Sequence, residues 1–191
     1  MANKPFLLGK NIYLRALTEE DCDGPYPGWF NDADVCKGNS HHVFPYSTPA
    51  ARTYVRQVNN RKDKLVLAIV RSKDNAHIGN IALDSINFVN RTAELTIIIG
   101  DKSCWKKGYG KEATRLICDH GFLSLNLNRI VCGTFENNIG MQKLAEYLGM
   151  AKEGVRRKAV YKSGHYLDVV EYGVLRSEYW ECFNKREEKE D

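Results

Sequence analysis

One stretch of the chain decides the fold, and it reads Ile97-Ile98-Ile99-Gly100-Asp101-Lys102-Ser103-Cys104-Trp105-Lys106-Lys107-Gly108-Tyr109-Gly110-Lys111-Glu112-Ala113. The β-branched apolar run at its start predicts the end of a strand. A loop rich in glycine and lysine follows, and a helical pattern begins after it. Glycines allow backbone N–H groups to approach a ligand closely, and the first N–H groups of a helix favour an anion. The stretch therefore predicts a pyrophosphate cradle, with an ordinary glycine-rich loop as the alternative.

Two well-known phosphate-binding motifs do not fit this stretch. The nucleotide P-loop has four residues between its glycines and continues with Lys-Ser or Lys-Thr. Here a single residue separates Gly108 from Gly110. The dinucleotide fingerprint needs a third glycine, which does not follow, and the preceding strand here is expected in an antiparallel meander.

The segments on either side predict a mixed, mostly antiparallel β-sheet of about seven strands flanked by helices. In chain order, the expected elements are a strand over 11–16, a helix from Thr18, helix 48–59, strands 65–71, 77–88 and 92–99, helix 110–124, strand 129–134, helix 139–148, and strands 155–162 and 166–175. Strands that alternate with helices in the middle of this order suggest one parallel pair. We expect a single α/β (α+β) domain over residues 1–184 and a charged tail over residues 185–191.

The composition is typical of a globular protein. Of the 191 residues, 43% are hydrophobic and 27% are charged, which argues against a disordered chain. No apolar run approaches the roughly 20 residues that a membrane helix needs. The first residues have no apolar core of a signal peptide, so we expect a cytoplasmic protein without a membrane partner.

Cysteine usage and charge point away from metal and nucleic acid. The six cysteines form no Cys-x-x-Cys pair and fit neither a zinc site nor a small disulfide scaffold. We expect reduced, mostly buried thiols and no metal. The net charge of +4 suits an anionic ligand or nucleic acid, but no basic stripe interleaved with aromatic residues is present. We therefore expect no nucleic-acid partner.

Short motifs along nearly the whole chain resemble one family. They are Ile12-Tyr13-Leu14-Arg15 with Thr18-Glu19-Glu20-Asp21, Trp29-Phe30-Asn31-Asp32, Ile78-Gly79-Asn80, Arg91-Thr92-Ala93-Glu94, Gly108-Tyr109-Gly110, Leu127-Asn128-Arg129-Ile130, Asn138, Leu148-Gly149-Met150, and Glu153-Gly154 through Gly164-His165-Tyr166-Leu167-Asp168. In this order they resemble the GNAT superfamily of N-acetyltransferases. The closest resemblance is to its RimJ/RimL-type branch of ribosomal-protein, spermidine and amino-sugar acetyltransferases.

The resemblance implies transfer of an acetyl group from acetyl-CoA to a primary amine. Strand 92–99 would carry a bulge and splay away from strand 129–134, so that the pantetheine arm enters the gap and a backbone N–H polarises the thioester carbonyl. The amine would attack the thioester directly, without a covalent enzyme intermediate. The residues that the resemblance places around acetyl-CoA are Ile97, Ile98, Ile99, Lys106, Lys107, Gly108, Tyr109, Gly110, Lys111, Asn138 and Lys143.

The same resemblance places the acceptor beside the irregular segment 29–46. The expected substrate-binding residues are Trp29, Asn31, Asp32, His42, Tyr46 and Asp84. Packing is the alternative role for Trp29. For His41 and His42 the alternatives are a base, a metal ligand or plain solvent exposure, and His165 is a further candidate for the border of the site.

Glu94 is the candidate catalytic residue. A primary ammonium has a pKa of about 10.4, so a base must remove a proton at pH 7 before the nitrogen can attack. Strand alternation places Glu94 and Ile98 on one face and Ile97 and Ile99 on the other. Three roles stay open: a base or proton relay, an anchor for a cationic acceptor, or a structural carboxylate paired with Arg91.

The chain departs from the family pattern at two sites. Trp105 stands where the family has Arg or Gln at the start of its motif A. The tyrosine that spermidine-type members place beside the CoA sulfur falls on Ala145, and the serine of some ribosomal-protein members falls on Met141. Neither can donate a proton, and Tyr147 lies about 200° from Ala145 around a helix. The CoA thiolate is a tolerable leaving group, so water is the expected proton source.

The acceptor stays open among an amino sugar, a small polyamine-like amine and a protein N-terminus. Because the usual proton donor is missing, a non-catalytic acyl-CoA-binding module is the alternative function. Whether the chain forms a homodimer is also open.

Overall fold

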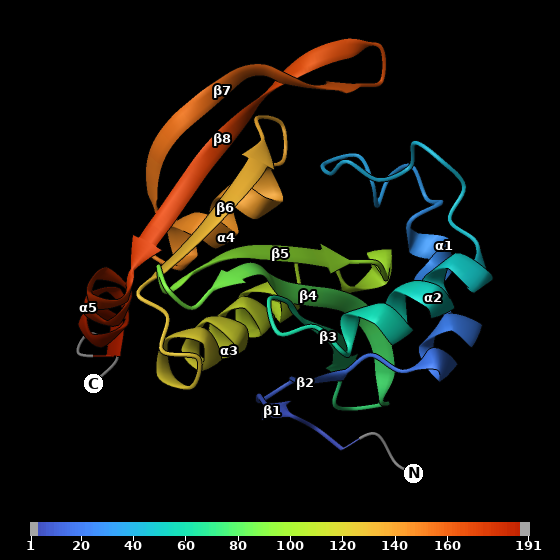
Figure 1. Ribbon diagram of the computed structural model, residues 1–191, viewed down its shortest axis with the longest axis horizontal. Coiled ribbons are helices and arrows are strands. Elements are labelled where there is room, and N and C mark those ends of the chain that lie inside the picture. Colours follow the sequence, from blue (N-terminus) through green and yellow to red (C-terminus); the bar gives the residue numbers. More distant parts are fainter. Residues whose placement is uncertain (1–3, 188–191) are drawn as a thin grey trace.

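An eight-stranded sheet organises the protein, as Figure 1 shows for the computed structural model, which describes residues 4–187. The strands are β1 (Leu7–Leu8), β2 (Ile12–Ala16), β3 (Leu65–Arg71), β4 (Ala76–Asn87), β5 (Thr92–Ile99), β6 (Arg129–Phe135), β7 (Ala151–Lys162) and β8 (His165–Leu175). Their order across the sheet is β1-β2-β3-β4-β5-β6-β8-β7. Among the described residues, only β5 and β6 pair in parallel. The predicted mixed, mostly antiparallel sheet is confirmed, with the two-residue strand β1 as an unpredicted addition.

The helices begin and end close to where the sequence predicts them. They are α1 (Tyr26–Trp29), α2 (Thr48–Val58), α3 (Tyr109–Leu123), α4 (Ile139–Tyr147) and α5 (Arg176–Glu187), with 3-10 turns η1 (Glu19–Asp23) and η2 (Lys102–Cys104). The helix predicted from Thr18 is only the short turn η1, because Gly24 and Pro25 interrupt it. Helix α2 is capped by Ser47, which accepts a hydrogen bond from the Ala50 N–H at 3.3 Å, and not by Thr48 as expected.

Helix α5 has no counterpart among the predicted elements. It packs through Tyr179 and Phe183, which lie one helical turn apart and are buried. The expected charged tail begins inside this helix at Lys185, and residues 188–191 of that tail lie outside the described residues.

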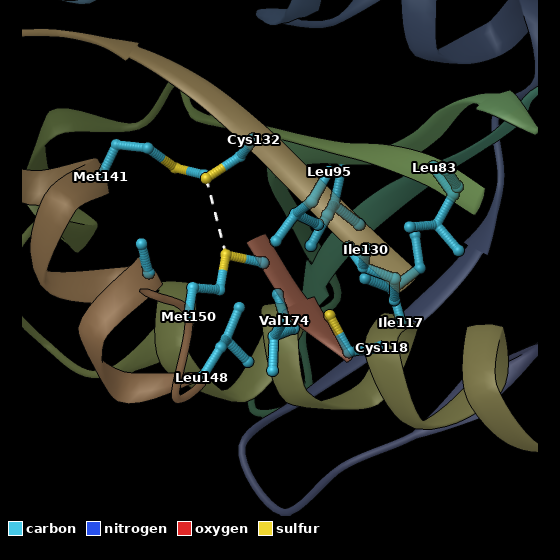
Figure 2. Close-up of a cluster of buried hydrophobic side chains, with 14 of the residues drawn as sticks. Leu83, Leu95, Ile117, Cys118, Ile130, Cys132, Met141, Leu148, Met150 and Val174 are labelled. Atoms are coloured by element: carbon cyan, nitrogen blue, oxygen red, sulfur yellow. Dashed lines mark hydrogen bonds between the residues drawn. The ribbon is translucent and has the colours of Figure 1, made fainter. Parts of the chain in front are cut away.

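The two faces of the sheet carry separate hydrophobic clusters. Helices α3, α4 and α5 cover one face, where Ile117, Ile130 and Leu148 are fully buried (Figure 2). Helices α1 and α2 cover the other face. All six cysteines lie within the described part of the chain and are free thiols, five of them buried, which confirms the prediction. In the first cluster the Cys132 thiol lies 3.6 Å from the Met150 sulfur.

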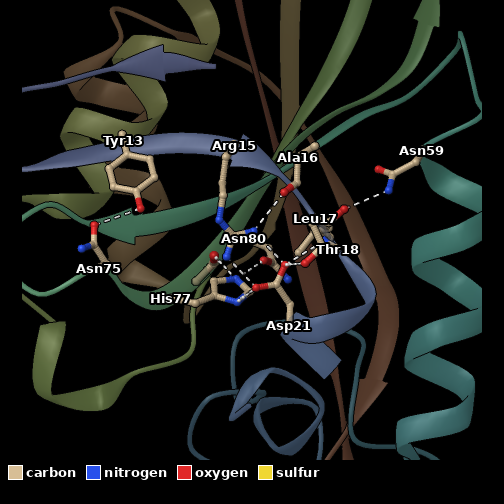
Figure 3. A network of polar contacts seen from close by, with 11 residues as sticks. Tyr13, Arg15, Ala16, Leu17, Thr18, Asp21, Asn59, Asn75, His77 and Asn80 are labelled. Carbon is tan, nitrogen blue, oxygen red and sulfur yellow. Dashed lines mark hydrogen bonds and ion pairs between the residues drawn. The ribbon is translucent and has the colours of Figure 1, made fainter. Parts of the chain in front are cut away.

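A buried polar network joins the start of the chain to β4, as Figure 3 shows. The Arg15 guanidinium donates two hydrogen bonds to the Asp21 carboxylate, at 2.8 and 2.6 Å. His77 Nδ1 lies 3.3 Å from Asp21, and its Nε2 donates to Asn80 Oδ1 at 2.8 Å. Burial alone raises the pKa of Asp21, but the hydrogen bonds from Arg15 and the Thr18 N–H, together with the adjacent His77 ring, outweigh it and hold that pKa far below its usual range.

Within residues 4–187, every helix is too short or too polar to cross a membrane.

Candidate active site

Strands β5 and β6 separate after a short parallel contact. They pair only at Thr92 with Arg129, Ala93 with Ile130 and Glu94 with Val131. Beyond Glu94 the two ribbons diverge (Figure 1), so residues 95–99 of β5 have no partner on β6. The backbone therefore opens at the place where the family resemblance predicts a gap.

The edge of β5 that faces this gap carries free backbone groups. The Gly100 N–H donates to the Ile78 carbonyl of β4 at 2.9 Å. Hydrogen bonding alternates along an antiparallel pair, so Ile98 also bonds to β4. The N–H and C=O groups of Ile97 and Ile99 consequently point toward the gap. An extended ligand could pair with all of them except the Ile99 carbonyl, which already accepts from the Trp105 indole N–H.

The predicted bulge in β5 is wrong. Register with β4 is regular from Gly79 and Ile99 to Asp84 and Glu94. The irregularity follows Asp84, on β4, where one extra residue is inserted and Ser85 takes a φ of 52°. No bulge is needed to aim Glu94, because its side of β5 already faces the cluster under α1 and α2, which Ile98 also contacts.

The start of helix α3 is an open anion-binding geometry. Gly108 lies just before the helix at a φ of 86°, a left-handed conformation that favours glycine. No side chain among the described residues caps this end, so the first N–H groups, from Tyr109 onward, are free. A Cβ on Gly108 would meet no atom within 4 Å, and one on Gly110 would touch only Leu144 and Ile97 at ordinary distances. A phosphate can therefore approach this backbone closely.

The lysines expected around the donor lie in the loop before α3, on α3 itself and on α4. Lys106 and Lys107 are exposed in the loop before α3, and Lys143 is exposed on α4. The Lys111 ammonium lies 5.2 Å from the centre of the Tyr147 ring, which joins α3 to the end of α4.

Asn138 connects the donor side to the acceptor segment. Its Oδ1 accepts from the Met141 N–H at 3.1 Å and so caps α4. Its Nδ2 donates to the Gly38 carbonyl oxygen at 3.0 Å. The residue expected to meet the pantetheine is thus also attached to the loop that follows α1.

Two expected substrate residues shape the acceptor segment from within. Asn31 exchanges two hydrogen bonds with the Tyr46 backbone, at 2.8 and 2.7 Å, and closes the segment into a loop. Asp32 accepts from the Asp34 and Val35 N–H groups and forms an ion pair with Lys102 at 2.8 Å. Lys102 lies in η2, so this pair fastens the acceptor segment to the donor loop.

The other expected acceptor residues differ in how much side chain they expose. Trp29 is only 5% exposed and packs against Gly100 and His77, which fits the packing alternative. Tyr46 is half-buried against Phe30. His42 is exposed and lines an open hollow formed by Phe30, Ser40, His41, His42, Val43 and Phe44.

The β7–β8 hairpin closes the acceptor side from above (Figure 1). Lys162 near its tip donates to the His41 carbonyl oxygen at 2.5 Å. His165 at the tip is exposed. Among residues 4–187 no group of three or more His, Cys, Asp or Glu side chains is arranged for a metal ion.

Three carboxylates line the acceptor face around the point where β5 and β6 separate. Asp84 lies directly across from Glu94 on β4 and forms an ion pair with Lys64 at 2.6 Å. Glu171 of β8 accepts from Arg156 at 2.6 Å. The Glu94 carboxylate has no hydrogen-bonding or ion-pair partner within residues 4–187.

The surroundings of Glu94 disfavour its charged form. Burial raises the pKa of this carboxyl, and the nearby carboxylates of Asp84 and Glu171 raise it further, against a lowering by Arg156 and Lys64. Arg91, the partner in the structural alternative, instead bonds to Asn126. A half-buried, unpaired carboxylate with a raised pKa is suited to accept a proton.

The thiolate side of the gap offers no proton donor at the positions where the family has one. Ala145 is fully buried and Met141 is 9% exposed, both in the core beneath α4. The Tyr147 ring packs edge-on against Phe183 at 5.5 Å, on the side of α5. Tyr147 thus faces away from the sheet gap, as the helical spacing predicts.

Sequence reasoning misses several residues of this site. Lys64 just before β3, Arg156 of β7 and Glu171 of β8 come near Glu94 because β3 pairs with β4 and β8 pairs with both β6 and β7, and no local motif marks them. The partner of Trp105 is also missed, since its indole N–H donates to the Ile99 carbonyl oxygen at 2.8 Å. Of the missed contacts, only those of Lys102 and Trp105 could have been suspected from the sequence, because both residues lie within the stretch 97–113.

Comparison with known proteins defines the class. A family model described as an acetyltransferase (GNAT) domain matches residues 11–151. The uncharacterized N-acetyltransferase p20 of Bacillus licheniformis is 30% identical over 178 residues, which cover 91% of this chain and 97% of that protein. The spermidine N(1)-acetyltransferase of Vibrio cholerae is 31% identical over 102 residues, 53% of this chain and 58% of that protein.

A solved structure shares the fold. The crystal structure of spermidine N-acetyltransferase from Vibrio cholerae in complex with CoA and spermine superimposes with a TM-score of 0.80 at 23% identity. The alignment covers 90% of this chain and 99% of that one. The chain therefore belongs to the GNAT acetyltransferase family and is an N-acetyltransferase.

Proposed function

We propose that this N-acetyltransferase moves the acetyl group of acetyl-CoA to a primary amine that arrives as an ammonium ion. The observation that carries the proposal is Glu94: an unpaired, half-buried carboxylate with a raised pKa, placed where β5 and β6 separate. A carboxylate in this state both attracts an ammonium and accepts its proton.

The donor half of the proposal follows from the backbone. The pyrophosphate of acetyl-CoA binds the free N–H groups from Lys106 to Lys111, with the charges of Lys106, Lys107 and Lys143 nearby. The pantetheine arm lies in the gap and pairs with backbone groups of Ile97 and Ile99. A backbone N–H at this edge polarises the thioester carbonyl.

The acceptor half uses the opposite side of the same gap. The amine enters between the segment 29–46 and the β7–β8 hairpin and meets Glu94, with Asp84 beside it. The free amine nitrogen attacks the thioester carbon, a tetrahedral intermediate forms, and the C–S bond breaks to release the CoA thiolate. Glu94 takes the first ammonium proton. The nitrogen gives its second proton to water as the intermediate collapses, and water passes a proton to the thiolate, because Ala145 and Met141 cannot.

Three acceptors have this chemistry: an amino sugar, a small polyamine-like amine and a protein N-terminus. A polyamine is included because spermidine acetyltransferases are among the relatives. It is not preferred over the other two, because this chain has Ala145 where the spermidine-type members have a tyrosine. We also propose that the chain belongs to the RimJ/RimL-type branch and acts in the cytoplasm.

A panel of amines tests the proposal. The purified protein is mixed with acetyl-CoA and either spermidine, an amino sugar or a short peptide with a free N-terminus, and release of the CoA thiol is followed with a thiol reagent. We expect one class to release thiol well above the rate of thioester hydrolysis, and Glu94→Gln to remove most of that excess. Tight binding of acetyl-CoA without transfer to any amine would refute the acceptor half, and failure to bind acetyl-CoA would refute the donor half.

A further inference from the structure

The Trp105 side chain is held in place by a single directed contact. Its ring is 40% exposed, and its indole N–H donates to the Ile99 carbonyl oxygen at 2.8 Å. Its backbone N–H ends the turn η2 by donating to the Lys102 carbonyl oxygen at 3.2 Å. The hydrogen bonds of the backbone N–H and of the indole N–H together fix the position of this exposed side chain.

The acceptor of the indole N–H lies on the edge of β5 that faces the gap. Because Gly100 and Ile98 bond to β4, the Ile99 carbonyl points the other way, toward the side that β6 has left. Trp105 therefore occupies one of the few backbone acceptors available to a ligand on this edge. The Ile99 N–H and both backbone groups of Ile97 remain open.

The same contact fixes the phosphate-binding loop relative to the strand. Lys106, Lys107 and Gly108 follow Trp105 directly, and Lys106 and Gly108 both have positive φ angles, 61° and 86°. Within residues 4–187, the indole N–H makes the only hydrogen bond that runs from residues 105–108 to β5. Trp105 therefore links this loop directly to the edge of β5.

We propose that Trp105 is a positioning residue that sets the spacing between the pyrophosphate cradle and the edge of β5. A donor that carries both a diphosphate and an extended arm must engage the two at once, so an error in their spacing weakens the binding of the whole donor. The inference rests on the proposed donor site. It predicts that Trp105 matters only for donors that use the cradle.

Two donors separate this role from a structural one. Acetyl-CoA has the diphosphate, whereas S-acetylpantetheine has the arm and the thioester without it. In Trp105→Phe, which keeps a large ring and loses the N–H, we expect kcat/KM for acetyl-CoA to fall about tenfold through KM, the equivalent of one good hydrogen bond. With S-acetylpantetheine we expect kcat/KM to stay within about twofold of wild type.

Matched variants complete the experiment. Trp105→Leu also lacks a side-chain donor and should show the same dependence on donor, which covers the case in which Trp105→Phe fails to fold. Trp180→Phe, on helix α5, should leave both donors unchanged. An equal loss with both donors, or no loss with acetyl-CoA, overturns the role of Trp105. A wild-type protein that does not use acetyl-CoA overturns the proposed function and this inference with it.

Discussion

The Asn138 side-chain amide donates to the Gly38 carbonyl oxygen at 3.0 Å and so joins two segments 100 residues apart in the chain. Gly38 must be a glycine for this contact, because a Cβ there would lie 2.7 Å from the Asn138 nitrogen. The first turn of α4, on the donor side, and the loop after α1, on the acceptor side, are thereby positioned by one side chain.

Asn138→Asp isolates this connection. Aspartate still caps α4 through the Met141 N–H, but it cannot donate to Gly38. We expect the amine KM to rise about fivefold, the effect of one neutral hydrogen bond, with little change in melting temperature. Asn138→Ala, which also loses the cap, should in addition lower the free energy of unfolding by about 1 kcal/mol. An unchanged amine KM in Asn138→Asp would show that the Gly38 contact does not shape the acceptor site.

Gly108→Asn tests the cradle. Asparagine is chosen because it tolerates the φ of 86° at this position, whereas a β-branched residue would be strained there. Its side chain would fill the open space in front of the free N–H groups and compete with the pyrophosphate. Isothermal titration should show acetyl-CoA affinity reduced by about tenfold or more. Equal affinity in wild type and variant would place the phosphate site elsewhere.

Glu94→Gln tests the base. We expect kcat/KM at pH 7 to fall by roughly 10²–10⁴, with much of the loss recovered at high pH, where the free amine exists without help. In wild type, kcat/KM should begin to fall on acidification at a pH above the usual pKa of a glutamate, about 4.3, because the pKa of Glu94 is raised. If the substitution raises only the amine KM and leaves the pH profile unchanged, Glu94 is an anchor.

Stability gives an independent control for the same variant. A carboxyl whose pKa is raised in the folded protein stabilises the fold below its unfolded pKa and loses that contribution as pH rises through the folded value. At pH 7 Glu94 is therefore destabilising, and Glu94→Gln should raise the melting temperature. A variant that is both less active and less stable would indicate a structural role for Glu94.

Tyr147→Phe should leave turnover within a few-fold of wild type. The ring packs against Phe183 of α5 and lies 5.2 Å from the Lys111 ammonium, and it stands on a different side of α4 from Ala145. Steady-state kinetics at saturating acetyl-CoA measure this directly. A loss of about two orders of magnitude, the effect of a missing general acid, would mean that Tyr147 protonates the thiolate.

Asp21→Asn should destabilise the fold strongly. It leaves the Arg15 guanidinium buried without its charge partner, in a pair whose side chains are 9% and 6% exposed. We expect a loss of about 3–5 kcal/mol in the free energy of unfolding at pH 7, measured by urea denaturation. Since the pKa of Asp21 is lowered in the folded state, its contribution is present above the unfolded pKa and disappears as pH falls toward the folded value. A wild-type stability that does not decrease below pH 4 would contradict this.

The parts of the site that sequence reasoning reached are those set by local rules. The glycines and the helical pattern after residue 108 predict the cradle and α3, and strand alternation predicts the face on which Glu94 lies. The acetyltransferase family follows from the order of short motifs and is confirmed by the family match.

The parts that were missed depend on contacts between distant segments. Glu171 of β8 and Arg156 of β7 reach Glu94 because β8 lies between β6 and β7, which no local pattern specifies. The bulge was assigned to β5 by resemblance, yet the extra residue is on β4, where the register depends on both strands. Helix α5 was missed because its aromatic residues Tyr179 and Trp180 are adjacent and its polar residues surround them, so no apolar stripe stands out.

The separation of β5 from β6 has a thermodynamic consequence. Residues 95–99 of β5 have no backbone partner on the side of β6. A donor arm bound there would take the place of a strand, and only the folded chain can bind it. Ligand at a hundred times its Kd then adds about 2.7 kcal/mol to the free energy of unfolding. The melting temperature of the protein should therefore report the concentration of its acyl donor, and the folded fraction of the enzyme should rise and fall with the supply of that metabolite.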